Sequence, residues 1–280
     1  MGRRLPPHVL PYQGSKRKLA PQILAALEGR RFERMIEPFC GSAAMTLAAA
    51  HVNVAERYRL GDSCGPIAAL WTSVIADPQA LADGYEALWL GQRDDTRSHY
   101  LAVRGAFWLQ PTPAALLYLL SRAVKNAARW SQDGRFNQSA DHRRRGVHPD
   151  RMRAQIEAAS TLLAPRTDVV EGDFEALIAD AGPRDLVYLD PPYGGTSTGK
   201  DRRYASGLQR EVLIAAVERL RGQGAAVVLS YDGSTGQRSY GPRLPAELGL
   251  RLLSLDAGRS SQATLLGRDE RTLESLYVAF

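Results

Sequence analysis

The sequence predicts an α/β fold with a doubly wound sheet that is mostly parallel and has an antiparallel C-terminal edge. Strand-like and helix-like patterns alternate over most of the chain, and such alternation forms a parallel sheet covered by helices on both faces. Residues 225–231 (AAVVLSY) form a near-continuous apolar run, which is typical of a strand buried on both faces. Two further apolar runs, at 250–255 and 273–278, predict a final antiparallel pair.

The other elements of the core follow from local patterns. The apolar residues of 15–27 have helical spacing. The strand at 185–190 (DLVYLD) is stopped by two prolines, and the amphipathic helix at 209–221 is followed by a glycine. In chain order, the sequence also predicts strands at 34–37, 58–62 and 167–173, and helices at 43–51 and 67–76.

The composition is that of a globular protein. Of the 280 residues, 44% are hydrophobic and 24% are charged, which is ordinary for a folded chain. No apolar run reaches the ~18 residues that a membrane helix needs, and the first residues lack the apolar stretch of a signal peptide. Two cysteines, Cys40 and Cys64, are too few for a disulfide framework or a structural zinc site. We therefore expect a cytoplasmic protein with no metal and no membrane partner.

Residues 77–166 interrupt the alternation and predict an inserted module. Helical patterns at 114–129 and 148–163 flank a polar, basic stretch at 130–147. The predicted domains are a core formed by residues 1–76 and 167–280 and a helix-rich module formed by residues 77–166.

Basic side chains are concentrated in two segments of the chain, although its net charge is only +6. Residues 1–35 carry eight basic and two acidic side chains, and residues 129–153 carry seven arginines and three aspartates. Two basic patches on a mildly acidic body favour a polyanionic ligand, while solvated surface arginines would give the same pattern.

Two predicted strands are each followed by a turn, one with a glycine and one with an acidic residue. Such turns lie at the edge where a doubly wound sheet binds its ligands. In the turn at 36–43 (IEPFCGSA), Gly41 has no Cβ to keep a cofactor from the backbone. The pattern G-x-G-x-x-G is absent, which argues against NAD. Asp62 lies 21 positions after Gly41, where an acidic residue typically bonds ribose hydroxyls. Taken alone, the two features are better explained by a structural turn and a helix cap.

The segment Asp190-Pro191-Pro192-Tyr193 is the most specific of the strand-end signals. Two prolines restrict the backbone so that the Asp190 carboxylate and the Pro191 carbonyl face one small volume. Two acceptors there are suited to both hydrogens of one exocyclic amine, and Tyr193 has a flat face for stacking a base. A structural corner explains the prolines but not the acid and the tyrosine.

Several segments occur in an order that is typical of one enzyme family. They include 11–16 (PYQGSK), 37–43 (EPFCGSA), Tyr100 with Arg104 and Phe107, Asn126 to Asn137, Asp173-Phe174, 190–193 (DPPY), and Ser230-Tyr231-Asp232. In this order, and over nearly the whole chain, they resemble the DNA adenine methyltransferases of the Dam-like family, the alpha group of amino-methyltransferases. The sequence departs from the family pattern at Ala43, which replaces a glycine of the cofactor turn, and at 138–145 (QSADHRRR), which replaces V-P-x-G.

The resemblance implies a Rossmann-like methyltransferase sheet with an inserted target-recognition module. The implied reaction is transfer of a methyl group from S-adenosyl-L-methionine to N6 of a flipped-out adenine in double-stranded DNA. The implied catalytic residues are Asp190, Pro191, Pro192 and Tyr193. The implied cofactor-binding residues are Tyr12, Lys16, Glu37, Phe39, Gly41, Asp62, Asp173, Phe174 and Asp190. The expected DNA-binding residues are Arg129, Arg135, Phe136, Asn137, Arg143, Arg144, Arg145, Lys200, Arg202 and Arg203.

Three other functions stay open at this point: methylation of adenine in RNA, methylation of cytosine N4, and DNA binding without catalysis. Asp190 and the N-terminal segment favour DNA over RNA, whereas DPPY alone does not separate adenine N6 from cytosine N4. A binding module would show no thermal shift with S-adenosylmethionine. We expect a monomer, with any restriction endonuclease on a separate chain.

Overall fold

The strands of the protein form one sheet. The computed structural model describes residues 5–92, 95–131, 133–192, 208–235, 238–239, 242–259 and 271–280. The strands are β1 (Phe32–Glu37), β2 (Ala55–Asp62), β3 (Thr167–Glu171), β4 (Asp185–Leu189), β5 (Ala226–Thr235), β6 (Arg238–Ser239), β7 (Arg251–Arg259) and β8 (Arg271–Ala279). Seven of them lie in the order β3-β2-β1-β4-β5-β8-β7, and β6 pairs with β5 beside this path.

The pairing confirms the predicted sheet. The five strands from β3 to β5 in this order are mutually parallel, and β8 and β7 form an antiparallel edge. Because parallel strands end on the same side, the segments that follow β1, β2, β3 and β4 all leave the sheet at one edge. The predicted strand at 167–173 is shorter than expected and ends at Glu171, because Asp173 already caps a helix.

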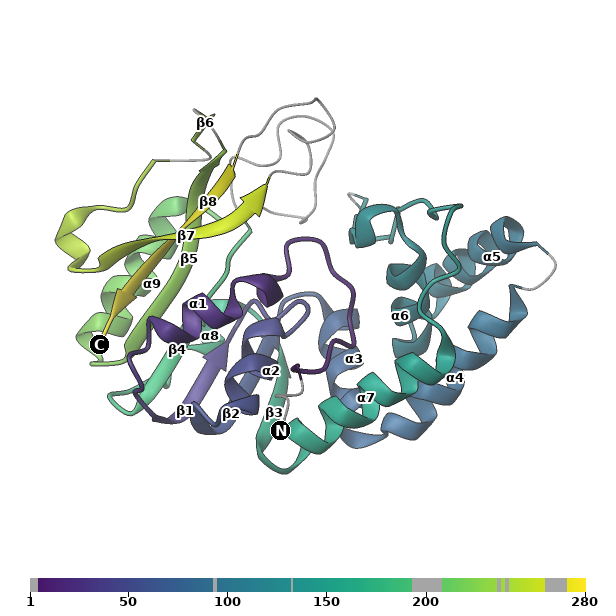
Figure 1. The fold of residues 1–280 in the computed structure, drawn as a ribbon, viewed down its shortest axis with the longest axis horizontal. Coiled ribbons are helices and arrows are strands. Elements are labelled where there is room, and N and C mark those ends of the chain that lie inside the picture. The colour runs from purple at the N-terminus through teal and green to yellow at the C-terminus, as the bar shows by residue number, and fades with distance from the viewer. Residues whose placement is uncertain are drawn as a thin grey trace.

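Helices cover both faces of the sheet (Figure 1). The strand residues alternate between two buried clusters: Leu186 and Tyr188 pack on one face, and Val187 and Leu189 pack on the other. The helices are α1 (Ala20–Ala25), α2 (Ala44–His51) and α3 (Gly65–Ala76) on the first face, and α8 (Phe174–Leu177) and α9 (Arg210–Gly222) on the second.

The inserted segment is helical, but its strongest predicted helix is shorter than expected. Its helices are α4 (Pro78–Gly91), α5 (Thr96–Leu109), α6 (Pro113–Arg122) and α7 (Pro149–Leu163). The predicted helix at 114–129 ends at Arg122, because Ala123 is extended and Lys125 and Asn126 both have left-handed backbone angles. The Asn126 side chain donates to the Leu120 carbonyl at 2.9 Å and so satisfies the end of α6.

The predicted helix at 15–27 is also interrupted. It begins as a 3₁₀ turn at Lys16–Lys18, and α1 then covers only Ala20–Ala25. Glu28 and Gly29 have positive φ angles of +53° and +77°, which end the helix before β1.

The inserted residues 77–166, here called the helical half, pack onto the rest of the chain, the sheet half, through a shared core. One buried cluster runs from Met35 and Leu60 in the sheet through Trp71 in α3 to Tyr85 and Leu116 in the inserted helices. Asp77, which lies at the predicted boundary, ends α3 and caps α4 by accepting the Ala80 N–H at 3.0 Å. The division into a core and a module stays a prediction, but its boundaries coincide with element ends.

An N-terminal segment, residues 8–16, crosses from the helical half to the sheet half (Figure 1). The His8 N–H donates to Gln155 of α7 at 2.6 Å, and the Gln13 N–H donates to the Asn126 carbonyl at 2.9 Å. Ser15 and Ser42 share a hydroxyl hydrogen bond of 2.9 Å next to α2. None of the described helices has the length and apolar character needed to cross a bilayer.

We expect Gly233→Ala to destabilise the protein by about 1–3 kcal/mol. Gly233 lies at a bulge in β5 with φ of +151°, and a Cβ there would lie 2.6 Å from the Leu273 carbonyl oxygen of β8. Thermal denaturation of the purified chain measures the effect. Gly105→Ala within α5 is the control: its Cβ would meet nothing within 4 Å, so we expect a gain of about 0.5–1 kcal/mol. Equal stability of the two variants would contradict the prediction.

Candidate active site

The turn between β1 and α2 lies at the carboxyl edge of the sheet in a compact conformation. Gly41 and Ala43 have left-handed backbone angles, with φ of +43° and +47°. Glycine adopts this region freely, whereas an alanine there is strained by about 1–2 kcal/mol. The Tyr12 ring lies over Gly41, because a Cβ built on the glycine would lie 3.5 Å from Tyr12 Cε1. The turn therefore brings Tyr12 of the N-terminal segment into contact with the end of β1.

Asp62, the last residue of β2, stabilises this turn through its carboxylate. Its Oδ2 accepts the Gly41 N–H at 3.0 Å, and its Oδ1 accepts the Cys64 N–H at 2.9 Å. Burial raises the pKa of Asp62, and the bonds from Cys64 and Gly41 oppose that shift. The carboxylate therefore holds the backbone on either side of the gap between β1 and β2, and a contact with ribose stays a prediction.

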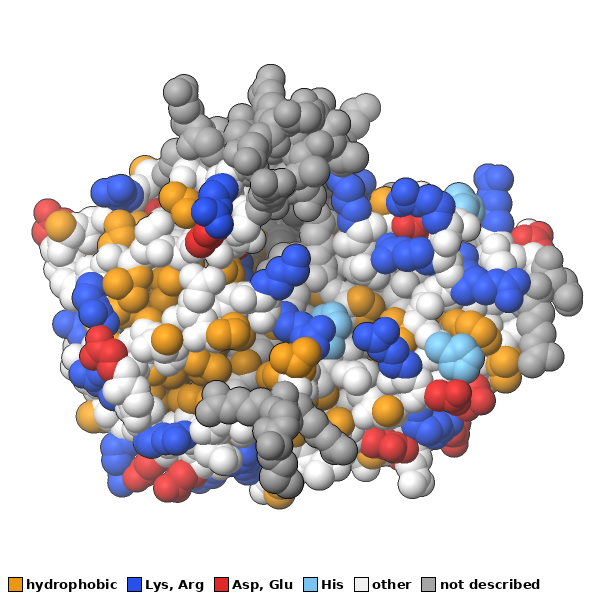
Figure 2. All heavy atoms as spheres, viewed as in Figure 1, with side chains coloured by type: hydrophobic (Ala, Val, Ile, Leu, Met, Phe, Trp, Pro, Cys, Tyr) orange, Lys and Arg blue, Asp and Glu red, His pale blue; other side chains and the backbone are white. Residues whose placement is uncertain are grey.

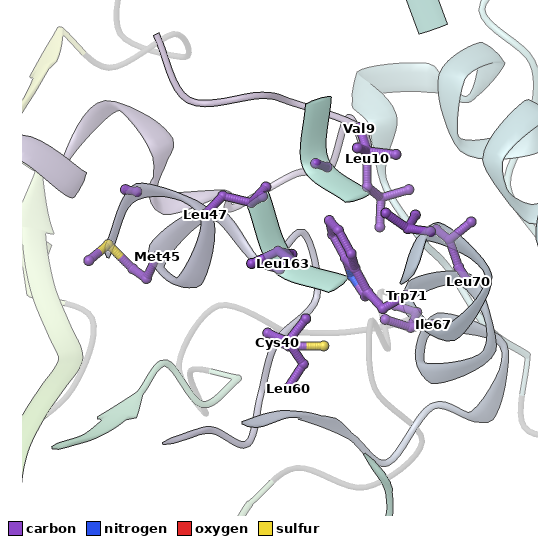
Figure 3. Close-up of a cluster of buried hydrophobic side chains, with 14 of the residues drawn as sticks. Val9, Leu10, Cys40, Met45, Leu47, Leu60, Ile67, Leu70, Trp71 and Leu163 are labelled. Atoms are coloured by element: carbon purple, nitrogen blue, oxygen red, sulfur yellow. The ribbon is translucent and has the colours of Figure 1, made fainter. Parts of the chain in front are cut away.

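The turn rests on a buried cluster centred on Trp71. The Trp71 indole N–H donates to the Gly41 carbonyl at 2.8 Å. Figure 3 shows Trp71 beside Leu10 of the N-terminal segment and Leu70 of α3, with Leu163 of α7 close by. Because these side chains come from distant parts of the chain, the conformation of the turn depends on the packing of both halves.

Glu37, the last residue of β1, carries a fully buried carboxyl group. Its Oε2 accepts hydrogen bonds from the backbone N–H and the hydroxyl of Thr46 in α2. The pKa of Glu37 is raised to about 8, chiefly by burial; the Thr46 bonds lower the pKa, and the charge of Asp190 raises it. At neutral pH the group is therefore mostly protonated, and a cation placed beside it would favour its ionised form.

Aromatic rings line the opposite side of the turn. Phe39 and Phe174 stack with their centroids 5.1 Å apart and their planes at 29°. The exposed Asp173 caps α8 by accepting the Glu175 N–H at 2.9 Å. The Gly172 N–H donates to the Asp62 carbonyl at 3.1 Å, so the segment after β3 lies beside the end of β2.

Asp190 follows β4 directly, and its carboxylate faces the N-terminal segment. The distance from Lys16 Nζ to Asp190 Oδ1 is 3.1 Å, and the distance from the same Nζ to Glu274 Oε2 is also 3.1 Å. Pro191 and Pro192 continue the chain from this point, and Tyr193 lies outside the described residues. The structure thus pairs Lys16 with Asp190, and a contact between Lys16 and a cofactor stays a prediction.

Most of the expected cofactor-binding residues meet at this edge of the sheet. Direct contacts join Tyr12 and Asp62 to Gly41, Phe39 to Phe174, and Lys16 to Asp190. Glu37 ends β1 at the same edge, where the charge of Asp190 acts on its carboxyl group. Asp173 is close by through its backbone, but its side chain is committed to capping α8.

Two of the expected DNA-binding arginines, Arg143 and Arg144, pair with one buried acid in the loop after α6. Asp141 forms ion pairs of 3.1 Å with both Arg143 and Arg144, and the bonds from Arg143 lower the pKa of Asp141 to about 2. Arg144 also donates to the Ala123 carbonyl at 3.0 Å, which ties the loop to the end of α6. The Arg143 side chain is 87% exposed, so Arg143 is presented to solvent while Arg144 braces the loop.

The remaining expected contacts differ in exposure. Phe136 is fully buried between Phe107 and Trp130, so the structure places it in the core of the helical half and not at a surface where it would wedge into a base stack. Arg135 is exposed and lies over the Trp108 ring at 5.8 Å. Asn137 and Arg145 are exposed, Arg129 is half-buried, and Lys200, Arg202 and Arg203 lie outside the described residues. Lys and Arg side chains lie along the upper part of the α4–α7 half (Figure 2).

Sequence patterns missed two acids that organise the site and the loop. Glu274 is a charged residue within the predicted strand 273–278, and this break in an apolar run was its one sequence signal. Asp141 stands among five polar or basic neighbours, and nothing local marks it as buried. In the described part of the chain, no group of three His, Cys, Asp or Glu side chains is placed to hold a metal ion.

Comparison with known proteins gives one family. The family model of the D12 class N6 adenine-specific DNA methyltransferases matches residues 12–213. The chain is 27% identical over 267 residues to a DNA N-6-adenine-methyltransferase of Escherichia phage P1. The alignment covers 90% of this chain but only 33% of that protein. The chain thus spans about a third of the length of that relative. The chain is also 22% identical over 263 residues to the Retron Ec67 DNA adenine methylase of Escherichia coli. This alignment covers 91% of the chain and 88% of that protein.

We expect Glu37 to make the unliganded protein less stable as the pH rises. Its folded-state pKa, about 8, lies above the unfolded value near 4.5, so its stabilising contribution is complete below pH ~4.5 and is lost by about pH 8. Glu37→Gln resembles the protonated acid and should remove this dependence, so that the variant is the more stable protein at pH 8.5. Thermal midpoints from pH 5 to pH 9 test this, with the exposed Glu56→Gln as the control. A wild-type curve parallel to that of Glu37→Gln would show that Glu37 ionises normally.

Proposed function

The chain belongs to the D12 class N6 adenine-specific DNA methyltransferase family, and on this premise we propose that it transfers a methyl group from S-adenosyl-L-methionine to N6 of adenine in double-stranded DNA. The observation that carries the proposal is the position of Asp190. It directly follows β4 at the edge where Glu37 and Asp62 end their own strands, and two prolines follow it. An acceptor for an amine and a glycine turn thus lie at the same edge of the sheet.

The residues at this edge fit the proposed methyl donor. Gly41 has no side chain, and the Tyr12 ring beside it has a flat apolar face. The buried Glu37 carboxyl is suited to an ammonium group, which would stabilise its ionised form. Asp62 accepts bonds from the Gly41 and Cys64 N–H groups and from the Cys40 thiol, and a carboxylate accepts about four, so it has room for a hydroxyl donor. When bound, the donor supplies an activated methyl group on a sulfonium, so no metal is required.

Asp190 acts on the target amine in this proposal. The exocyclic nitrogen of adenine is a weak nucleophile, because its lone pair is conjugated with the ring. The Asp190 carboxylate and the Pro191 carbonyl accept its two hydrogens and so favour a tetrahedral nitrogen with an available lone pair. Asp190 also holds the proton that the nitrogen releases after the new N–C bond forms. Positioning of this nitrogen by the two acceptors accounts for much of the rate enhancement.

The proposed substrate is a duplex, and its adenine must leave the base stack to reach Asp190. Tyr193, which lies outside the described residues, is the proposed stacking partner of the extruded base. Exposed arginines of the helical half, Arg135 and Arg143, are proposed to contact the DNA beside it. Because Phe136 is fully buried, we assign no DNA contact to it.

We expect Asp190→Ala to abolish methyl transfer and to leave most binding of S-adenosylmethionine intact, because Asp190 contacts the amine and the Glu37–Gly41 turn binds the donor. Transfer of tritiated methyl groups to mixed-sequence DNA, followed by nucleoside analysis, measures the activity and identifies N6-methyladenine. Titration calorimetry measures donor binding. Asp190→Asn should keep some activity, because its amide oxygen still accepts a hydrogen bond. Turnover of Asp190→Ala near the wild-type rate would sink the assignment.

We expect the helical half to set the DNA sequence that is methylated. Alanine at a base-reading arginine costs about 1–3 kcal/mol at the cognate site and relaxes one base position, whereas alanine at a phosphate-binding arginine lowers the salt slope by about one. Arg135→Ala, Arg143→Ala and Arg145→Ala are assayed on a randomised DNA library, with the exposed Arg151→Ala of α7 as the control. If none of the three changes the methylated motif, recognition lies elsewhere in the chain.

A further inference from the structure

We propose that Glu274 is a positioning residue for methyl transfer, which acts by holding the Lys16 ammonium between itself and Asp190. The inference rests on the proposed function, in which Asp190 accepts the hydrogens of the target amine. Glu274 belongs to β8, far in sequence from both Lys16 and Asp190, and no residue of β8 was expected at the site.

The three charged groups form a compact, buried arrangement. Lys16 Nζ lies 3.1 Å from Asp190 Oδ1 and 3.1 Å from Glu274 Oε2. The Lys16 side chain is only 6% exposed, and the side chains of the two acids are 20% and 21% exposed. A buried ammonium is costly unless it is paired and hydrogen-bonded, so Lys16 depends on both carboxylates.

The sheet explains why Glu274 reaches this place. Alternate residues of β8 share a face, so Glu274 is on the side of Leu276 and Val278, which pack in the same cluster as Leu19 and Ile23 after Lys16. Because β8 runs antiparallel to β5, its first residues lie at the edge where β4 ends in Asp190. The backbone of Glu274 is opposite Gly233 at the bulge in β5.

A second contact orients the Glu274 carboxylate. The Ser230 hydroxyl donates to Glu274 Oε2 at 3.4 Å, which is the same oxygen that Lys16 contacts. Ser230 is almost fully buried in β5, on the strand beside β4. Ser230 of the neighbouring strand β5 therefore orients the Glu274 carboxylate toward Lys16 of the N-terminal segment.

The charge balance gives Glu274 its effect on the reaction. Lys16 alone would neutralise Asp190 and draw its electron density away from the amine hydrogens that it has to accept. With Glu274 present, one cation is shared by two anions, and Asp190 keeps more of its acceptor strength. The shared ammonium also restricts the rotation of the Asp190 carboxylate, and misplacement of a reacting group by about 1 Å can cost about 100-fold in rate.

The test combines single and double variants of the full-length chain. Glu274→Gln removes the charge with little change of shape, Glu274→Asp keeps the charge on a shorter side chain, and Glu247→Gln removes an exposed charge from the same half as a control. Each is assayed for methyl transfer to mixed-sequence DNA, for the Kd of S-adenosylmethionine and for its thermal midpoint. Lys16→Gln and the double variant Lys16→Gln/Glu274→Gln complete a cycle.

We expect kcat of Glu274→Gln to fall about 10- to 100-fold, while its KM and donor Kd stay near those of wild type. Its thermal midpoint should fall only slightly, because Asp190 still pairs with Lys16. Glu274→Asp should recover part of the loss. In the Lys16→Gln background, Glu274→Gln should cost little more, because its effect passes through Lys16. A normal kcat in Glu274→Gln, a loss that multiplies fully with that of Lys16→Gln, or a fall in thermal midpoint that accounts for the lost activity would each overturn the inference. An inactive wild-type chain would instead refute the proposed function on which it rests.

Discussion

The parallel pairing of β1 with β2 and β4 is the constraint on which the site depends. Glu37 pairs in register with Leu60, and Ile36 pairs with Val187, so Glu37, Asp62 and Asp190 leave the sheet within a short stretch of the same edge. The Asp62 brace and the Trp71 bond then shape the backbone at a place that the sheet topology has already selected. With a different register, the turn after β1 and the Asp190 carboxylate would lie farther apart.

The site concentrates charge where water has little access. Among the described groups, a mostly protonated Glu37 lies near an ammonium that is shared between two carboxylates. This arrangement carries net negative charge even with Glu37 neutral, and it therefore favours a cationic ligand. The strained alanine at position 43 adds a second local cost, and such departures are commonly concentrated at functional sites.

The sequence predicted the sheet and the β1–α2 turn because their signals are local. Apolar runs and paired prolines mark strands such as 185–190 without any knowledge of the tertiary structure. The helix at 114–129 was wrong beyond Arg122, because the left-handed angles of Lys125 and Asn126 depend on how the loop folds back on α6. Phe136 matched a family motif, yet its burial follows from packing against Phe107 and Trp130, which a motif cannot reveal. Glu274 was missed because its partner, Lys16, lies at the other end of the chain.

The N-terminal segment connects the strand-end turn to the helical half, and under the proposed function it thereby couples two binding events. Tyr12 covers Gly41 at the strand-end turn, and the next residue, Gln13, bonds to Asn126 in the helical half. In the proposed reaction, a first ligand that binds against this segment stabilises its conformation, and the second ligand then meets a segment that is already held in place. Such coupling is reciprocal: in the proposed reaction, the factor by which DNA changes the affinity for the methyl donor equals the factor by which the donor changes the affinity for DNA. On the same proposal, the few residues between Tyr12 and Lys16 link the order in which the two substrates bind to the geometry in which they meet.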